Sequence, residues 1–147
     1  LIEEAKQVRS NGSRLLVGTS FTRRQLPTTK VIDSSDFVLL HGNGVDTVGG
    51  IRRMVNGVRG IDSYRGQPIV FNEDDHFDFQ SPNNNFREAL EAGASWGYFD
   101  PGDAANGGFA YGDYINGYQN PPINWDINTR RKKDFFDFVG EVTGSIQ

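Results

Sequence analysis

Four short apolar runs recur along the chain, and each one ends in polar residues. The runs are "RLLVGTSF" (14–21), "DFVLLHGNG" (36–44), "PIVFNED" (68–74) and "ASWGYFD" (94–100). Apolar and polar residues do not alternate strictly within them, which is typical of strands that are buried on both faces of a parallel sheet. Segments with helical periodicity separate the runs. This order of elements predicts an α/β fold built from four successive βα units.

The segments between the runs carry apolar residues at spacings of three and four, which is the pattern of one helix face. The clearest such face is formed by Val48, Ile51, Val55, Val58 and Ile61. Segment 81–95 also reads as a helix, and Gly93 suits its C-terminal end. A third helix is expected over 129–144, with Phe135, Phe138, Val139 and Val142 on one stripe. Segment 22–35 is mostly loop-like, although Pro27 could begin a short helix.

The polar ends of the runs help to choose between two α/β architectures. The active site of a β/α barrel is assembled from the carboxyl ends of several strands, whereas a dinucleotide-binding sheet concentrates its signal in one glycine-rich turn. The turn "HGNGVDTVGG" does not match G-x-G-x-x-G, and Asp46 would repel a phosphate there. We therefore predict a (β/α)8-barrel wall. An open sheet that binds a ligand at its strand ends is the alternative.

The number of strands predicts that the barrel is incomplete. A β/α barrel needs eight strands and about 250 residues, and this chain of 147 residues has four candidate strands. We therefore predict that residues 1–147 form the C-terminal half, strands 5–8, of a β/α-barrel catalytic domain. Such a half would leave two sheet edges unpaired. Its expected partner is a missing N-terminal half-barrel or a second chain.

Composition excludes several classes of partner. The net charge is −4, and "RRKK" at 130–133 is the longest basic run, so we expect no binding to nucleic acid. No apolar stretch approaches the roughly 20 residues that span a bilayer, so we expect no membrane insertion. The chain has no cysteine, which is compatible with either redox compartment and leaves an extracellular or periplasmic location open. No cofactor is predicted.

The stretch "QPIVFNEDDHFDF" (67–79) contains the strongest candidate for chemistry. An apolar strand leads directly into Asn72, Glu73 and the acidic residues that follow. A Glu at the end of a buried strand is held in place by the sheet, as a catalytic carboxylate must be. Two other interpretations stay open, a solvated acidic loop and a hard-cation site made by Glu73, Asp75, His76 and Asp78. The spacing of these four residues matches no known cation loop, and no metal is predicted.

Two of these motifs resemble a known family. "PIVFNED" at one strand end and "GASWGYFD" at the next resemble the last two strands of β/α-barrel glycoside hydrolases of the large retaining clan. "KKDFFDFVGEVTG" (132–144) is similar to the closing helix of such a barrel. In order, the four runs would be strands five (14–20), six (36–41), seven (68–72) and eight (94–99).

The resemblance implies retaining glycoside hydrolysis of an oligo- or polysaccharide. That reaction uses two carboxyl groups roughly 5 Å apart, one as nucleophile and one as acid/base. Glu73 would be one of them, and the second would lie outside this chain, so the chain alone is expected to be inactive. An Asn before the catalytic Glu is more typical of the acid/base after strand four, so both roles stay open for Glu73. We predict substrate contacts from His41, Asn43, Asn72, Trp96 and Asp100.

Each of these contacts has a structural alternative. His41 could be a hydrogen-bonded structural histidine, Trp96 a core tryptophan between sheet and helix, and Asp100 a turn-forming residue. The segment 100–128 is rich in Gly, Asn and Tyr, and we expect it to be a long loop on the active face that contacts sugar. A different function is also open, namely a non-catalytic carbohydrate-binding or assembly module with the same half-barrel.

Overall fold

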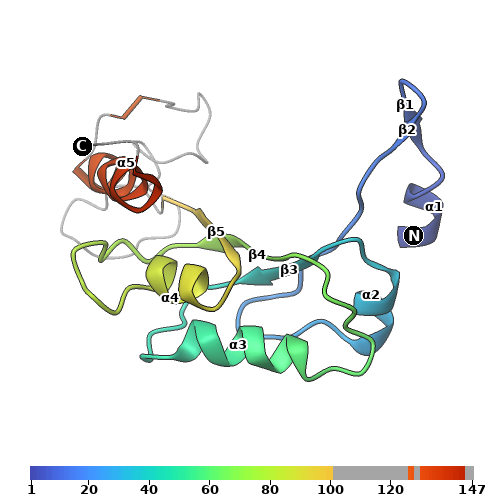
Figure 1. Ribbon diagram of the computed structural model, residues 1–147, viewed down its shortest axis with the longest axis horizontal. Coiled ribbons are helices and arrows are strands. Elements are labelled where there is room, and N and C mark those ends of the chain that lie inside the picture. Colours follow the sequence, from blue (N-terminus) through green and yellow to red (C-terminus); the bar gives the residue numbers. More distant parts are fainter. Residues whose placement is uncertain (101–125, 128–129, 145–147) are drawn as a thin grey trace.

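The computed structural model describes residues 1–100, 126–127 and 130–144 of the chain. Figure 1 shows a parallel sheet with two helices on one face and an N-terminal hairpin that projects away from it. The elements, in chain order, are α1 (Ile2–Ala5), β1 (Arg9–Ser10), β2 (Ser13–Arg14), α2 (Thr29–Ser34), β3 (Val38–His41), α3 (Gly50–Arg59), β4 (Ile69–Asp74), α4 (Asn85–Glu91), β5 (Ser95–Tyr98) and α5 (Arg130–Thr143).

The central feature is a three-stranded parallel sheet in the order β3-β4-β5. Helix α3 connects β3 to β4, and α4 connects β4 to β5, so the chain forms two successive βαβ units. Val38 pairs with Ile69 near the start of β3 and β4, and Phe71 pairs with Trp96 across β4 and β5. The strands are parallel, so their carboxyl ends meet at one edge of the sheet.

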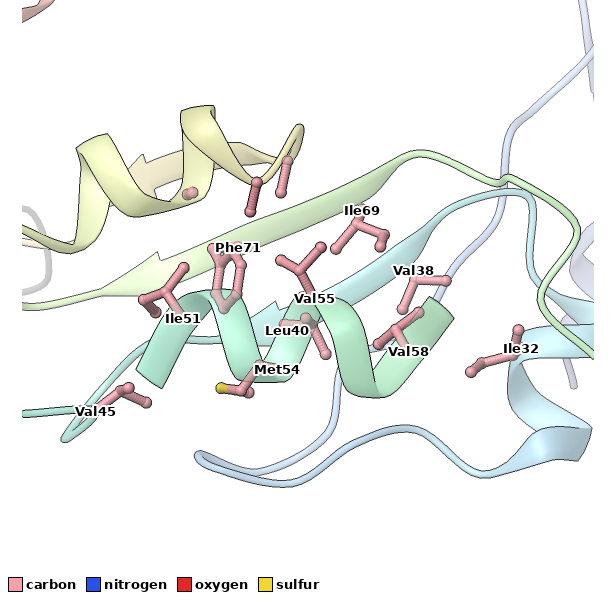
Figure 2. Packing of buried hydrophobic residues seen from close by; sticks show 13 residues of the cluster. Ile32, Val38, Leu40, Val45, Ile51, Met54, Val55, Val58, Ile69 and Phe71 are labelled. Carbon is pink, nitrogen blue, oxygen red and sulfur yellow. The ribbon is translucent and has the colours of Figure 1, made fainter. Parts of the chain in front are cut away.

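The main core lies between the sheet and α3 (Figure 2). Leu40 on β3, Phe71 on β4, and Ile51 and Val55 on α3 are all completely buried. Burying one such side chain stabilises the fold by about 1.5–3 kcal/mol. The periodicity that predicts a helix here is confirmed over narrower bounds, because Val48 precedes α3 and is 70% exposed.

A second, aromatic cluster joins α4, α5 and β5. Phe79, Phe86 and Phe138 form its buried part, and the rings of Phe86 and Phe138 meet edge to face at 5.1 Å. The apolar stripe predicted for the last helix is confirmed, since Phe135, Phe138, Val139 and Val142 all belong to this cluster or pack against it.

The prediction of four βα units forming half of a β/α barrel is wrong. Three parallel strands are present among the described residues, and the run 14–20 does not form the first strand of this sheet. Only Ser13–Arg14 is a strand, and it pairs antiparallel with Arg9–Ser10. Leu16, which the prediction would bury, is 70% exposed.

The run 14–20 is anchored by side-chain hydrogen bonds and not by parallel strand pairing. The Asp36 carboxylate accepts hydrogen bonds from Arg14 at 2.6 Å and from the Val17 amide at 2.8 Å, and the Asp36 amide donates to Val17 O. The chain then passes Phe37 so closely that a Cβ on Gly18 would lie 2.7 Å from Phe37 O. Hydrophobicity alone cannot distinguish such an anchored segment from a buried strand.

The N-terminal hairpin turns at Asn11 and Gly12. Both have positive φ, 49° and 79°, as a type I′ turn requires. The short helix expected after Pro27 is also confirmed, as α2.

The long loop predicted over 100–128 falls mostly on residues 101–125 and 128, which lie outside the described residues. Of the helices that the structure describes, none has both the length and the apolar character needed to cross a bilayer.

Candidate functional site

The carboxyl ends of β3 and β4 bring His41 and Glu73 together. The two residues are partners in the strand register, and His41 Nε2 lies 3.8 Å from Glu73 Oε2. Their side chains are 18% and 31% exposed. Leu40 and Asp74 are fully buried on the helix-covered face, so strand alternation turns His41 and Glu73 toward the opposite face. His41 and Glu73, which the sequence predicted separately as site residues, therefore form a partly exposed imidazole–carboxylate pair.

A bulge in β4 produces this pairing. Leu40 pairs with Phe71, but the next residue, His41, pairs with Glu73, so Asn72 is an extra residue in β4. Ile69 and Phe71 point into the core, and strict alternation would turn Glu73 into the core as well. The bulge reverses this phase, exposing Asn72 and burying Asp74.

Sequence reasoning missed Asp74, which is the most enclosed carboxylate at this edge. Its Oδ2 accepts hydrogen bonds from Trp96 Nε1 at 2.8 Å and from Asn85 Nδ2 at 2.9 Å, and its Oδ1 accepts the His76 amide at 3.1 Å. A Cβ on Gly42 would lie 2.1 Å from Asp74 Oδ2, so only glycine fits there. Asp74 therefore joins β4 to β5 and α4 by hydrogen bonds and packs against the end of β3 at the carboxyl edge of the sheet.

His76 lies between two carboxylates. Its Nδ1 is 2.5 Å from Asp74 Oδ1, and its Nε2 is 2.9 Å from Asp46 Oδ1. The bond to Asp74 is the main cause that raises the pKa of His76 to about 9, against partial burial, which lowers it. At neutral pH both ring nitrogens therefore carry protons and donate. The sequence assigned His76 no role beyond the metal alternative, because the contact with Asp46 spans 30 residues.

The side chains of Trp96 and Glu73 lie on opposite faces of the sheet. Its ring stacks on Phe86 with centroids 5.0 Å apart and 10° between the planes, and it stacks on Tyr98 at 6.1 Å. Its indole N–H is bonded to buried Asp74. These contacts favour the alternative of a core tryptophan over a sugar platform.

The two remaining predicted contacts are both buried. Asn43 is 5% exposed, and its Oδ1 has no hydrogen-bond partner in the part of the chain that the structure describes. Asp100 is 1% exposed and forms an ion pair with Arg131 of α5 at 3.5 Å. Asp100 therefore joins the end of β5 to α5.

Three adjoining hollows surround the loop between β3 and α3, and Asp46 lines all of them. The first, of about 390 Å³, extends past Arg23 to Phe77, and the second, of about 520 Å³, lies beside Arg24 and Arg53. The third, of about 200 Å³, lies over the start of α4. We call these three hollows together the Asp46 groove.

A cation site is a further chemical option at this edge. Ligand atoms of Asp74, Asp75 and His76 lie within 4.8 Å of one another. This set differs from the predicted alternative, because it contains Asp74 and lacks both Glu73 and Asp78. A metal bound here would have to displace the Nδ1 proton of His76, which the bond to Asp74 stabilises.

Comparison with known proteins found no family model that matches, no similar curated protein and no similar solved structure.

Proposed function

We propose that Glu73 is a catalytic carboxylate of a retaining glycoside hydrolase that acts on an oligo- or polysaccharide. The observation that supports this most directly is the pairing of Glu73 with His41 at the carboxyl edge of the sheet, 3.8 Å apart and partly open to solvent. Both backbones belong to strands, so the pair is held on rigid elements, as catalysis requires. His41 is close enough to orient or protonate the carboxylate with a small movement.

The reaction needs a second carboxyl group roughly 5 Å from the first. Asp74 is unsuited to this role, because it is fully buried and all its described contacts turn it away from Glu73. We propose that the second carboxylate comes from outside this chain, or from residues other than those that the structure describes.

Carbohydrate binding without hydrolysis is a second candidate. The burial of Asp74 favours this candidate, because it leaves Glu73 without an assigned partner carboxylate. The Asp46 groove would then be the functional feature, and Glu73, which lines none of its three hollows, would not be needed.

The test is hydrolysis of a glycan panel by the wild-type chain and by Glu73→Gln, assayed with any partner that completes the enzyme. We expect Glu73→Gln to lower kcat by about 100-fold or more, since positioned acid/base groups contribute about 10²–10⁴-fold. Glu91→Gln is the matched control, because Glu91 lies on the exposed surface of α4, paired with Arg52. Equal turnover by Glu73→Gln and wild type would remove Glu73 from the mechanism. Glycan binding with no hydrolysis by the wild type would favour the second candidate.

A further inference from the structure

We propose that the Asp46 groove binds a linear, electrically neutral oligosaccharide along several sugar units. The choice of a carbohydrate rests on the proposed function. The chain length and the neutrality of the ligand are inferred from the groove itself.

The shape of the groove supports an extended ligand. The first and second hollows share Gly44 and Asp46, and the first and third share Asp46, His76 and Asp78. The two larger hollows, of about 390 and 520 Å³, each fall in the range of about 300–1,000 Å³ that is usual for small-molecule sites. Because the hollows adjoin at Asp46, one chain-like molecule can occupy them together.

The charges in the groove support a neutral ligand. Among the described residues, charges of both signs line the hollows: the carboxylates of Asp46, Asp75 and Asp78, the guanidinium groups of Arg23, Arg24 and Arg53, and the protonated imidazole of His76. A polyanion would bring its charges against the carboxylates, and a polycation would bring its charges against the guanidinium groups. A polyhydroxylated neutral chain avoids both costs. Its hydroxyls can donate to carboxylates and accept from guanidinium groups.

The groups at the centre of the groove are oriented before a ligand binds. Asp46 Oδ1 accepts from His76 at 2.9 Å, and Asp46 Oδ2 accepts from Arg24 at 3.3 Å. The Asp46 side chain is nevertheless 70% exposed, and each carboxylate oxygen can accept more than one bond. Arg53 is likewise fixed, by Thr47 Oγ1 at 2.7 Å. Fixed donors and acceptors lose less conformational entropy on binding.

An apolar surface in the first hollow complements these polar groups. The Phe77 side chain is 44% exposed there. The guanidinium of Arg131 lies 5.0 Å from the ring centroid and steadies the ring. The exposed part of the ring can pack against the C–H face of a sugar.

Calorimetry on the Glu73→Gln chain tests the inference without hydrolysis of the probes. The neutral probes are cellohexaose, xylohexaose and mannohexaose with their monosaccharides, and the charged probes are hexagalacturonate and chitosan hexamer. We expect at least one neutral hexasaccharide to bind about tenfold or more tighter than its monosaccharide and tighter than either charged hexamer. Asp46→Ala should weaken that binding by about tenfold, the value of one to two hydrogen bonds.

Asp33→Ala is the control, because Asp33 is an exposed, Arg65-paired aspartate of α2, at the other end of the sheet (Figure 1). It should leave affinity unchanged, and thermal unfolding should show both variants folded. Four outcomes would each overturn the inference. They are tightest binding of a charged hexamer, equal affinity for a hexamer and its monosaccharide, no binding of any probe, and undiminished binding by Asp46→Ala. Hydrolysis by Glu73→Gln would count against the proposed function alone. Tight binding of a neutral hexasaccharide that Asp46→Ala does not weaken would count against the groove alone.

Discussion

A single buried carboxylate, Asp74, organises the end of the molecule where the candidate site lies. Its two oxygens accept hydrogen bonds from Trp96, Asn85 and His76, which belong to three separate segments. The Asp74 side chain is fully enclosed, so no water can take its place as the acceptor of these hydrogen bonds. The geometry of the neighbouring Glu73 therefore depends on a residue that no ligand would touch.

Replacing Asp74 should cost more stability than any surface aspartate does. We expect Asp74→Ala to lower the free energy of unfolding by about 3–5 kcal/mol, because it removes the buried acceptor that His76 Nδ1, Trp96 Nε1 and Asn85 Nδ2 share. Asp33→Ala removes an exposed pair with Arg65 and should cost less than about 1 kcal/mol. Urea denaturation of the two variants measures both values. Similar costs for the two substitutions would contradict the account of Asp74.

The bulge at Asn72 explains why sequence analysis found Glu73 but not Asp74. The apolar positions Ile69 and Phe71 set a period of two that places Glu73 in the core and Asp74 outside it. One inserted residue exchanges the two roles. Nothing in the string "FNEDDH" shows where the extra residue falls, because every residue after Phe71 is polar.

At the scale of elements, His76 connects the end of β4 to the loop between β3 and α3. It does so through its bonds to Asp74 and Asp46, and Asp75 lies a further 3.6 Å from its Nδ1. These three groups are carboxylates, so the connection is strongest while the imidazole is protonated. The Asn85 amide nitrogen also lies 3.0 Å from His76 Nδ1. This loop forms the centre of the Asp46 groove.

Stability should therefore depend on pH through His76. The folded pKa, about 9, lies above the ordinary value of 6.5. The folded state thus binds this proton more tightly than the unfolded state does. The contribution of the His76 proton to the free energy of unfolding is complete below about pH 6.5 and is lost as the pH rises through about 9. One pKa unit is worth about 1.4 kcal/mol, so the contribution of His76 to the free energy of unfolding is at most about 3.5 kcal/mol, reduced by solvent screening at Asp46.

The measurement is the difference in free energy of unfolding between wild type and His76→Gln at about pH 6 and about pH 10. We expect the advantage of the wild type to be large at the lower pH and small at the higher pH. Taking the difference between two chains cancels the titration of other groups. An advantage that is equal at both pH values would show that the proton on His76 does not hold the loop.

The elements of the sheet were predictable because their runs are apolar and their spacing is regular. The predicted strands 36–41, 68–72 and 94–99 overlap β3, β4 and β5, and the helix face around Val55 is the one that packs on the sheet. The prediction was wrong for 14–20, where Arg14 and Val17 are bonded to the Asp36 side chain. A side-chain anchor leaves no periodic signal, so the sequence could not separate it from a strand.

At the scale of the whole molecule, the sheet is covered unequally. Helices α3 and α4 lie on one face (Figure 1), and the main core and Trp96 lie on that side. His41 and Glu73 turn to the other face, at the edge where the parallel strands end. The Asp46 groove opens at the same edge. His41 and Glu73 thus lie apart from the apolar residues that hold the fold, whereas His76 both lines the Asp46 groove and holds the loop beside it.

The most direct test of the central claim is chemical rescue of Glu73→Ala by azide, with an activated aryl glycoside as substrate and with any partner that completes the enzyme. Azide can replace the missing carboxylate only if Glu73 acts at the sugar's reacting carbon or activates the group that does. We predict that azide restores turnover and gives a glycosyl azide, with inverted configuration if Glu73 is the nucleophile and retained configuration if it is the acid/base. No azide product and no recovery of rate, in a folded variant that has lost activity, would contradict the claim.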